Sequence, residues 1–484
     1  MFNFRDKNPA QSVSPLERLR NSSVILGINR FMMSPCFVLF IGLLSLISNV
    51  FSAELPVYTF FVLCGIYLSF FGADYLPLMP IVIFSYISPS MANNPGKNPQ
   101  SIFFPEHGGM ILYTMAGVFA ATLLWRLLAD RNWGKTAFFT TERKLLPSIL
   151  ILGGAYFLAG AGSGLYFSHG LGNIIFAFLQ FLSVFLMYYF FTGAVVWKHA
   201  PKDYFAWVGF TVGIVLVLEL INIYRISDII VDGSIFRDHI VTGWGMRNNI
   251  GGLLSVTIPF AFYLSCYKKH GWFYHLFVLI FIVATCFTCS RGGMVGTVCA
   301  YVVSYWVMFK KGCRRRTNLI LLFAELGLLG LFVSLFFDDL YRLFFRLIDW
   351  GLNPTFRDEF FVEGFKQFWK YPIFGGSFYP TDYDLWDWSS VDAFSSFFPP
   401  RWHNTVVQLA ASCGIIGLAA YSFHRYQTVK LLLHKPNVEM AFIAVSIGIL
   451  LVISLFDSHM FNVGPVLLYS MLLAFGEKCK LCES

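Results

Sequence analysis

The sequence predicts an all-α polytopic membrane protein, and two observations support this fold class. Hydrophobic residues make up 57% of the 484-residue chain and charged residues only 13%, with a mean hydropathy of +0.64. That composition leaves too little polar surface to cover a soluble globule of this size. Apolar runs also recur along nearly the whole length, and at roughly 17 to 22 residues each is long enough to cross a hydrocarbon core of about 30 Å.

The apolar runs predict a bundle of 12–14 transmembrane helices. Helices are expected because an unpaired backbone amide is costly in lipid, and no alternating barrel pattern is present. The third run is short and contains Pro77 and Pro80, so it is either a span or a broken or re-entrant segment. The candidate spans lie at 35–51, 56–72, 76–90, 109–127, 145–162, 172–197, 204–222, 250–267, 272–288, 293–309, 318–337, 405–422, 439–456 and 462–476.

The spans divide the chain into segments with a long loop near the C-terminal end. That loop is far longer than ordinary connections between helices, and its stretch 357–369 has an apolar face at helical spacing, so it is expected to be partly helical. We expect a cytoplasmic N-terminal segment (1–34), N-terminal transmembrane helices (35–222), central transmembrane helices with an outer loop at 223–249 (223–337), a long periplasmic loop (338–404), C-terminal transmembrane helices (405–476) and a cytoplasmic tail (477–484).

Lysine and arginine in the short loops predict the orientation. Lys268-Lys269, Arg314–Arg316 and the basic stretch 425–435 fall on one side if the spans alternate, and so do both termini. The positive-inside bias places that side in the cytoplasm. This inner collar of cations accounts for the net charge of +8, so nucleic-acid binding is not expected.

The ten cysteines do not predict a disulfide scaffold. Several lie within apolar spans, where cysteine behaves as a small hydrophobic residue. Two pairs have CxxC spacing, Cys286 with Cys289 and Cys479 with Cys482, but they fall on opposite sides of the predicted membrane and cannot share one metal ion. A metal or redox site at either pair remains the alternative. We expect no metal, and no cofactor because nucleotide-binding fingerprints are missing.

His403 is the candidate catalytic residue. His403-Asn404 stands at the mouth of the span 405–422, and Gly414-Ile415-Ile416-Gly417 follows nine residues later. A histidine at the water boundary of a membrane helix titrates and exchanges protons freely. A neutral imidazole near pH 7 is suited to taking the proton of a hydroxyl nucleophile, so His403 is predicted to be a general base.

Three arginines lie on the predicted outer face, against the positive-inside bias: Arg247, Arg291 and Arg357. A planar guanidinium binds phosphate oxygens bidentately and stays charged at physiological pH, so these residues are candidates for binding a diphosphate. The alternative is that they contact lipid headgroups or pair with nearby acids such as Asp358. Arg247 ranks lower, because the stretch that it opens is also typical of a helix N-terminus, whose amides themselves bind anions.

Two further residues lie in the predicted outer loops. Arg401 lies two residues before His403 and is a lower-ranked candidate for the diphosphate, with a structural ion pair across the loop as the alternative. His239 has no motif around it and is interpreted as a plain loop histidine.

Ordered motifs carry a resemblance to a known family. Ser290-Arg291-Gly292-Gly293 follows an apolar span, Arg357 precedes Tyr371-Pro372-Ile373-Phe374-Gly375, and His403-Asn404 is followed at the stated spacing by Gly414 and Gly417. In this order, with the long loop between the second arginine and the histidine, they are similar to the motifs of the O-antigen ligase and polymerase superfamily. The resemblance covers about residues 204–420, and fourteen spans exceed the twelve usual for the ligases.

The resemblance implies a metal-independent glycosyltransferase of the GT-C type at the periplasmic face of a bacterial inner membrane. Its donor would be a glycan on undecaprenyl diphosphate, and its acceptor a hydroxyl of lipid A-core in a ligase or of another lipid-linked repeat in a polymerase. Arg291 and Arg357 would correspond to the arginines that engage the diphosphate, and His403 to the histidine that activates the acceptor. The histidine motif belongs to both branches, while chain length favours a polymerase.

A multi-span transporter or a flippase for lipid-linked glycans is the alternative class. Such proteins usually show internal repeats with broken helices at corresponding positions, and no repeat is evident here. The spans hold few ionisable residues, chiefly Glu219 and Glu325, which are interpreted as buried carboxylates with local partners, proton coupling being the alternative. The long asymmetric outer loop favours an enzyme.

Overall fold

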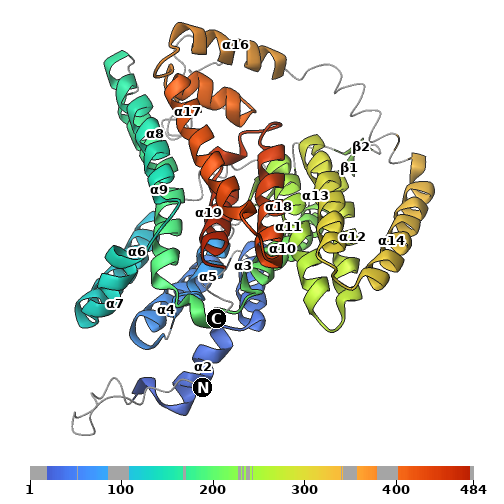
Figure 1. Cartoon of the computed structure of the whole chain (residues 1–484), viewed down its shortest axis with the longest axis horizontal. Coiled ribbons are helices and arrows are strands. Elements are labelled where there is room, and N and C mark those ends of the chain that lie inside the picture. Colours follow the sequence, from blue (N-terminus) through green and yellow to red (C-terminus); the bar gives the residue numbers. More distant parts are fainter. Residues whose placement is uncertain are drawn as a thin grey trace.

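The protein is a helical bundle (Figure 1). The computed structural model describes residues 19–51, 53–72, 74–85, 108–166, 170–226, 230–231, 234–235, 240–242, 244–338, 341, 357–378 and 402–479. Within these residues the only strands are two hairpins with two-residue strands, in the segment predicted as the outer loop 223–249. The all-α polytopic prediction is confirmed.

The helices follow the predicted order. Those of the first half are α2 (Ser23–Met32), α3 (Pro35–Phe51), α4 (Glu54–Phe71), α5 (Leu78–Ser85), α6 (Gly108–Ala129), α7 (Arg131–Lys135), the π-helix η2 (Thr136–Thr140), α8 (Leu146–Tyr166), α9 (Gly170–Ala194), the 3-10 helix η3 (Trp197–His199) and α10 (Tyr204–Ile226). Those of the second half are α11 (Arg247–Tyr267), α12 (Gly271–Phe287), α13 (Arg291–Lys310), α14 (Arg315–Leu335), α16 (Arg357–Lys370), α17 (Thr405–Leu433), α18 (Val438–Ile453), the 3-10 helix η7 (His459–Phe461) and α19 (Val463–Lys478). Strands β1 (Ile230–Val231) and β2 (Ser234–Ile235) pair antiparallel, as do β3 (Val241–Thr242) and β4 (Gly245–Met246).

Each predicted apolar run coincides with a helix, but the helices differ in length. Within the described residues, 6 are long and apolar enough to cross a membrane, or up to 7 if the bent pair α2 and α3 forms one span, and the other apolar helices are shorter. The third run is represented by α5, which ends at Ser85, where the description stops. The count of 12–14 spans therefore stays a prediction.

Helix α11 lies at the centre of the bundle. Every residue from Ile250 to Cys266 is buried, beneath the neighbouring helices α10, α12, α13 and α18. Glycines permit close approaches between these helices: a Cβ added at Gly293 of α13 would lie 2.7 Å from the backbone carbon of Gly251. The enclosed part of α11 begins at Ile250, and the three residues before it, Arg247 to Asn249, are half-buried.

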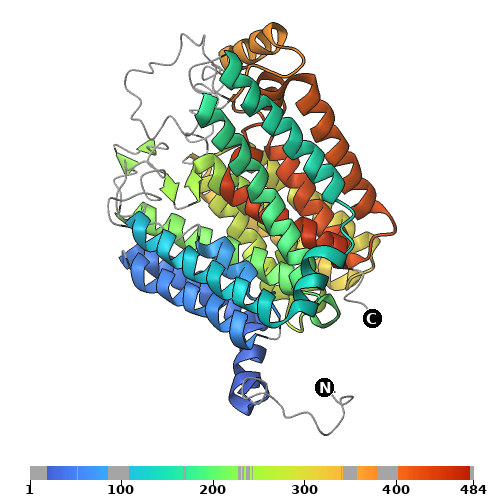
Figure 2. The ribbon, with the colours of Figure 1, turned by 90° about the vertical axis from the view of Figure 1, so that its left-hand side faces the viewer.

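A second layer consists of α8 and α9, which pack against each other and against the C-terminal helices. Helix α8 contacts α17, and α9 contacts α19 (Figure 2). The helices α3 to α7 pack lower on the bundle, toward the end where α2 lies, and α16 lies across the opposite end (Figures 1 and 2).

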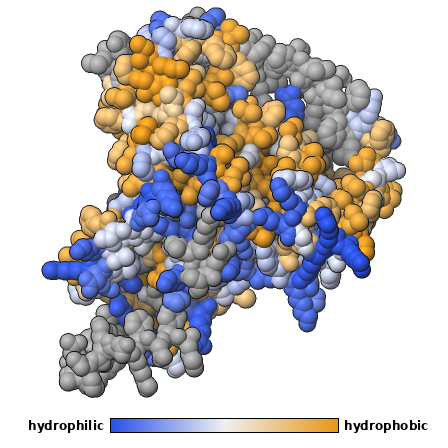
Figure 3. Space-filling model, viewed as in Figure 1, coloured by the Kyte–Doolittle hydropathy of each residue, from blue (hydrophilic) through white to orange (hydrophobic). Residues whose placement is uncertain are grey.

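The loops predicted to be cytoplasmic meet at the end of the bundle opposite α16. Lys311 donates to the carbonyl of Pro436 (2.6 Å), Lys268 pairs with Asp203 (2.5 Å), and Lys478 at the end of α19 donates to the carbonyl of Glu142. Hydrophilic residues gather over this lower part of the molecule (Figure 3). The grouping agrees with the predicted collar of cations, whereas the membrane face toward which it points stays a prediction.

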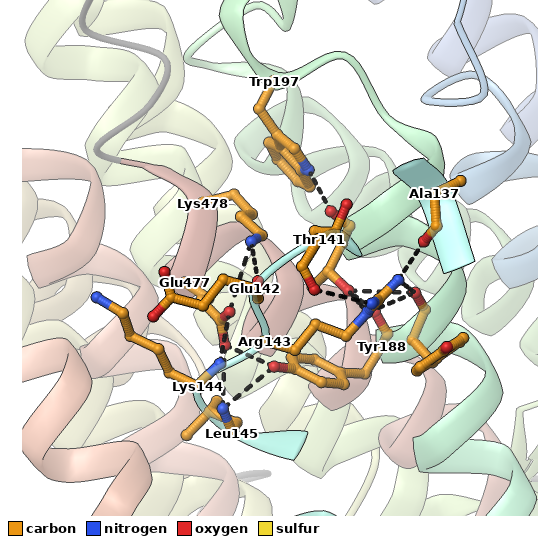
Figure 4. Close-up of polar contacts among 12 residues, drawn as sticks. Ala137, Thr141, Glu142, Arg143, Lys144, Leu145, Tyr188, Trp197, Glu477 and Lys478 are labelled. Carbon is orange, nitrogen blue, oxygen red and sulfur yellow. Dashed lines mark hydrogen bonds and ion pairs between the residues drawn. The ribbon is translucent and has the colours of Figure 1, made fainter. Parts of the chain in front are cut away.

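At the end of the bundle opposite α16, hydrogen bonds to the last turn of α19 hold the start of α8 (Figure 4). The carboxylate of Glu477 accepts hydrogen bonds from the amides of Lys144 (2.9 Å) and Leu145 (3.2 Å) and from the hydroxyl of Tyr188 (2.6 Å). Helix N-termini carry amides without intrahelical partners, and a carboxylate stabilises them. Arg143 donates to the carbonyls of Thr141 (3.0 Å) and Tyr189 (3.2 Å), which ties the same loop to α9.

Candidate functional site

A polar junction surrounds the turn that joins α18 to α19. Asp457 in this turn is largely buried, and its two carboxylate oxygens face different helices. Oδ1 lies 3.3 Å from Nδ1 of His403, just before α17, while Oδ2 accepts from Nδ2 of Asn248 in the first turn of α11 (2.9 Å). The amide of Ser458 also donates to Oδ1 (2.7 Å). One carboxylate therefore links α11, α17 and the α18–α19 turn.

The next residue of α11 makes a second link to the same turn. Oδ1 of Asn249 accepts from Nδ2 of Asn462 (2.7 Å) and lies 3.1 Å from Nδ1 of His459. Asn248 and Asn249 thus fix the start of the central helix against residues that are more than two hundred positions away in the sequence.

His403 is held in an unusual backbone conformation at the start of α17. Its φ of 51° is left-handed, and the next residue, Asn404, caps the helix by accepting from the amides of Val406 (2.8 Å) and Val407 (3.1 Å). Nδ2 of Asn404 donates in turn to the carbonyl of Leu455 (2.9 Å). The cap and this cross-link fix the backbone of His403. Residues with a strained backbone such as this one are common at functional sites.

The imidazole of His403 is positioned by two contacts and remains 35% exposed. Its ring lies 5.4 Å from that of Phe360 in α16, centroid to centroid, and Nδ1 faces Asp457. A ring that donates from Nδ1 to a carboxylate keeps Nε2 as its proton acceptor. The arrangement can therefore present a basic nitrogen to a molecule that reaches the exposed side.

The same contacts shift the acidity of Asp457. Burial raises the pKa of its carboxyl, but the hydrogen bond from His403, the nearby imidazoles of His459 and His403 and the amide of Ser458 outweigh burial, so the pKa lies well below its usual range. Asp457 is thus a carboxylate at neutral pH.

The two helices that start with predicted arginines lie beside this turn. Arg247 is the first residue of α11 and Arg291 the first of α13, and both are half-buried. Ser290 caps α13 by accepting from the amide of Gly293 (3.1 Å). A Cβ added at Gly292 would lie 2.8 Å from Cβ of Phe456. Because Phe456 directly precedes Asp457, the start of α13 lies next to the turn that carries Asp457.

Arg357 begins α16, as predicted, and α16 covers the start of α17. A Cβ added at Gly364 would lie 2.6 Å from Val407 and 3.3 Å from the ring of Trp402. The side chain of Arg357 lies outside the described part of the structure, as do the lower-ranked candidates Arg401 and His239. The helix of Arg357, but not its guanidinium, is therefore placed next to His403.

The predicted glycine motif marks a break in α17. Gly414 has φ 61° and ψ −156° inside the helix, and the turn after α16 fills the gap with backbone hydrogen bonds. The amides of Ile415 and Ile416 donate to the carbonyls of Pro372 (2.9 Å) and Ile373 (3.3 Å). On the other side of the break, the amides of Gly376 and Ser377 donate to the carbonyls of Ala411 (2.7 Å) and Ser412 (3.1 Å).

Close backbone packing explains why both partners in this contact are glycines. A Cβ added at Gly414 would lie 2.5 Å from the carbonyl oxygen of Ile373, and one at Gly375, where φ is 77°, would lie 2.2 Å from the carbonyl carbon of Ser412. Gly417 is buried one turn later, and a Cβ there would lie 2.2 Å from Cβ of Cys413. The motif therefore joins the loop helix to α17 rather than supplying reactive groups.

The remaining polar candidates have local partners. Glu219 accepts from Nδ2 of Asn49, and Glu325 is bonded to His275 (2.8 Å), Tyr301 (2.8 Å) and Tyr305 (2.6 Å). Cys289 is buried and Cys286 half-buried, whereas Cys482 lies outside the described residues. Within the residues that the structure describes, no three His, Cys, Asp or Glu side chains are grouped so as to hold a metal ion.

Residues 276–422 match the family model of the O-antigen ligases. They form an O-antigen ligase domain. The match confirms the family predicted from the ordered motifs and supports a function of the ligase or polymerase type, with lipid-linked glycans as substrates. No curated protein matches the chain. The O-antigen ligase domain includes Arg291, Arg357 and His403, whereas Arg247 precedes it and Asp457 follows it.

Sequence reasoning missed Asp457, His459 and Asn462. The predicted spans 439–456 and 462–476 leave Asp457–Phe461 as a short connection that contains a carboxylate and an imidazole. Ionisable residues at the end of an apolar span are functional candidates by default, so this connection carried a usable signal. The pairing of Asp457 with His403 had no such signal, because it depends on the packing of α17 against α18.

Proposed function

We propose that this protein is a glycosyltransferase that moves a glycan from undecaprenyl diphosphate to a hydroxyl of an acceptor glycan, at the periplasmic face of a bacterial inner membrane. The observation that carries the proposal is the contact of His403 with Asp457, which gives the domain of the O-antigen ligase type a candidate base. A carboxylate that orients a histidine and stabilises its protonated form is a recurring arrangement for activating hydroxyl nucleophiles.

The proposed reaction uses Nε2 of His403 as the base. As the acceptor oxygen attacks the anomeric carbon, Nε2 takes its proton, and the bond between the anomeric carbon and the diphosphate oxygen breaks. The electron pair of that bond leaves with the lipid diphosphate. Asp457 holds the ring through Nδ1 and stabilises the imidazolium that forms.

Arginines would stabilise the leaving diphosphate. Arg291 and Arg357 are the proposed partners of its oxygens, with Arg247 and Arg401 as lower-ranked ones. Support comes from the start of α13 at Arg291 and of α11 at Arg247 beside the Asp457 turn, because helix N-termini also favour anions. Charge grows on the diphosphate as the bond breaks, so fixed cations stabilise the transition state more than the bound donor.

The proposal is tested in a strain of the native host whose only copy of this protein carries His403→Ala. The measurement is the length of the lipid-linked glycans and of the surface glycans. Accumulation of single repeat units on the carrier, or of one-unit caps, identifies a polymerase, which the chain length favours. Long chains that stay on the carrier without reaching the surface acceptor identify a ligase. The matched control is His434→Ala, at the other end of α17 and exposed, which is expected to leave the glycans unchanged.

The alternative function, a transporter or flippase, predicts a different result. Glycan profiles that stay unchanged in the His403→Ala strain, with the variant inserted at normal levels, would rule out the proposed base and favour transport.

A further inference from the structure

Helix α16 exposes two sides of different chemistry. Its inner side packs on the start of α17, where Phe360 and Phe361 lie against Trp402 and Val407. Of its exposed residues, the large apolar ones are spaced by three and four positions and therefore share one side of the helix: Val362, Phe365 and Trp369. The charged residues Glu363 and Lys366, which form an ion pair, lie along the neighbouring edge.

The turn after α16 adds two more exposed apolar residues. Ile373 and Phe374 are exposed, and with Val362, Phe365 and Trp369 they form a set that we call the α16 stripe. Trp369 is the most exposed of them, at 75%. Isolated apolar residues on a surface need no explanation, but a contiguous set of this kind marks an interaction surface.

Backbone hydrogen bonds to α17 fix the position of this turn along the length of the candidate span. Pro372 and Ile373 accept from the amides of Ile415 and Ile416, which lie well inside the candidate span Thr405–Leu433. Ile415 is itself exposed on that candidate span. The turn of the α16 stripe is therefore held against an exposed part of a helix that is apolar enough to cross a membrane, and the upper part of the molecule is largely apolar (Figure 3).

We propose that α16 is an interfacial helix, with the α16 stripe in lipid and the edge of Glu363 and Lys366 in water. Helices of this kind lie in the membrane plane with Trp and Phe on the buried side and charged residues on the other. The occupant of the stripe is thus the lipid of the bilayer itself. Binding to a protein partner would explain neither the charged edge beside the stripe nor the position of its turn next to the exposed Ile415.

This position has a consequence for the candidate base. Phe360, on the inner side of α16, contacts His403. The helix that covers the histidine therefore lies at the surface of the bilayer. Resting on the proposed function, this means that a lipid-linked donor reaches His403 sideways from the membrane and does not pass through water.

Fluorescence quenching tests the location of α16 without any activity. The full-length protein is placed in nanodiscs made with phospholipids brominated high on the acyl chain, and the emission of Trp369→Phe is subtracted from that of the original chain, which isolates Trp369 from the 12 tryptophans. We expect this emission to be quenched by the bromolipid and shielded from aqueous acrylamide. Trp306→Phe, exposed on a candidate span, and Trp244→Phe, buried, give the lipid-facing and enclosed references.

Two results would overturn the location. Quenching by acrylamide but not by bromine would place Trp369 in water. Protection from both quenchers would place it against another protein, including a second copy of this chain.

The sideways route has its own readout. Trp369→Glu is expected to raise the KM for the lipid-linked donor several-fold with kcat unchanged, while Lys366→Glu, on the watery edge, leaves KM unchanged. Bromine quenching combined with an unaltered KM in Trp369→Glu would overturn the route. Failure of the proposed function would look different, since the original chain would then show no transfer at all while the quenching result stood.

Discussion

Nδ1 of His403 lies 3.3 Å from Oδ1 of Asp457, although 54 residues separate the two in the sequence. The second oxygen of Asp457 is occupied by Asn248, so the carboxylate is held from two helices and cannot rotate without breaking a contact. The orientation of the imidazole therefore depends on the α18–α19 turn and on the central helix, as well as on its own loop.

Replacing Asp457 by Asn tests this dependence. The amide has no negative charge with which to stabilise an imidazolium, so glycan transfer is expected to fall about 100-fold or more, with little change in the KM for the donor. The rate is measured on purified protein with a lipid-linked donor. Glu439→Gln is the matched control, because Glu439 is a buried carboxylate near the other end of α18, bonded to Tyr263 (3.0 Å). Equal rates in both variants would remove Asp457 from the mechanism.

The same carboxylate predicts how stability depends on pH. The pKa of Asp457 is depressed in the folded protein, so its contribution is fully present above the unfolded value of about 4 and is lost as pH falls below that value. The difference in thermal midpoint between the original chain and Asp457→Asn, measured in detergent, is therefore expected to shrink as pH falls from 4 toward 3. A difference that stays unchanged over that range would contradict the assignment.

The sequence was informative about elements and less so about their pairing. Each predicted apolar run coincides with a helix, and the helix of residues 357–369 was recognised from its spacing because that signal is local. The partners of His403 depend on contacts between segments that are distant in the sequence, and local sequence patterns carry no information about such contacts. The break at Gly414 was also hidden, since a single glycine in an apolar run is compatible with an unbroken helix.

Gly414→Ala is expected to destabilise the protein by about 2 to 4 kcal/mol. The added Cβ would need a left-handed backbone and would meet the carbonyl oxygen of Ile373 at 2.5 Å, so α16 would lose its attachment to α17. Thermal unfolding in detergent measures the change. Gly448→Ala in α18, where an added Cβ meets nothing within 4 Å, is expected to be neutral or slightly stabilising. A similar loss in both variants would mean that the break has no special role.

The β3–β4 hairpin leads directly into the start of α11. The hydroxyl of Thr242 in β3 accepts from the amide of Trp244 (3.2 Å), just before β4 leads into Arg247. Thr242→Val removes this bond and is expected to cost about 1 kcal/mol of stability.

Thr211→Val is the control for this substitution. Thr211 is a buried threonine of α10 whose hydroxyl has no hydrogen-bond partner among the described residues, so its loss is expected to be neutral. Thermal unfolding of the two variants in the same detergent makes the comparison. Equal midpoints would show that the hairpin is not held through Thr242.

Arg291→Lys separates charge from geometry at the start of α13. Lysine keeps the positive charge but loses the planar fork that binds two phosphate oxygens at once, so the KM for the lipid-linked donor is expected to rise and kcat/KM to fall by about tenfold or more. Arg225→Lys is the control, since Arg225 lies in the last turn of α10 and bonds Asn222 of its own helix (3.1 Å). Steady-state kinetics with a donor that carries diphosphate measure both variants. Unchanged kinetics in Arg291→Lys would show that a point charge suffices there and that the fork binds no phosphate.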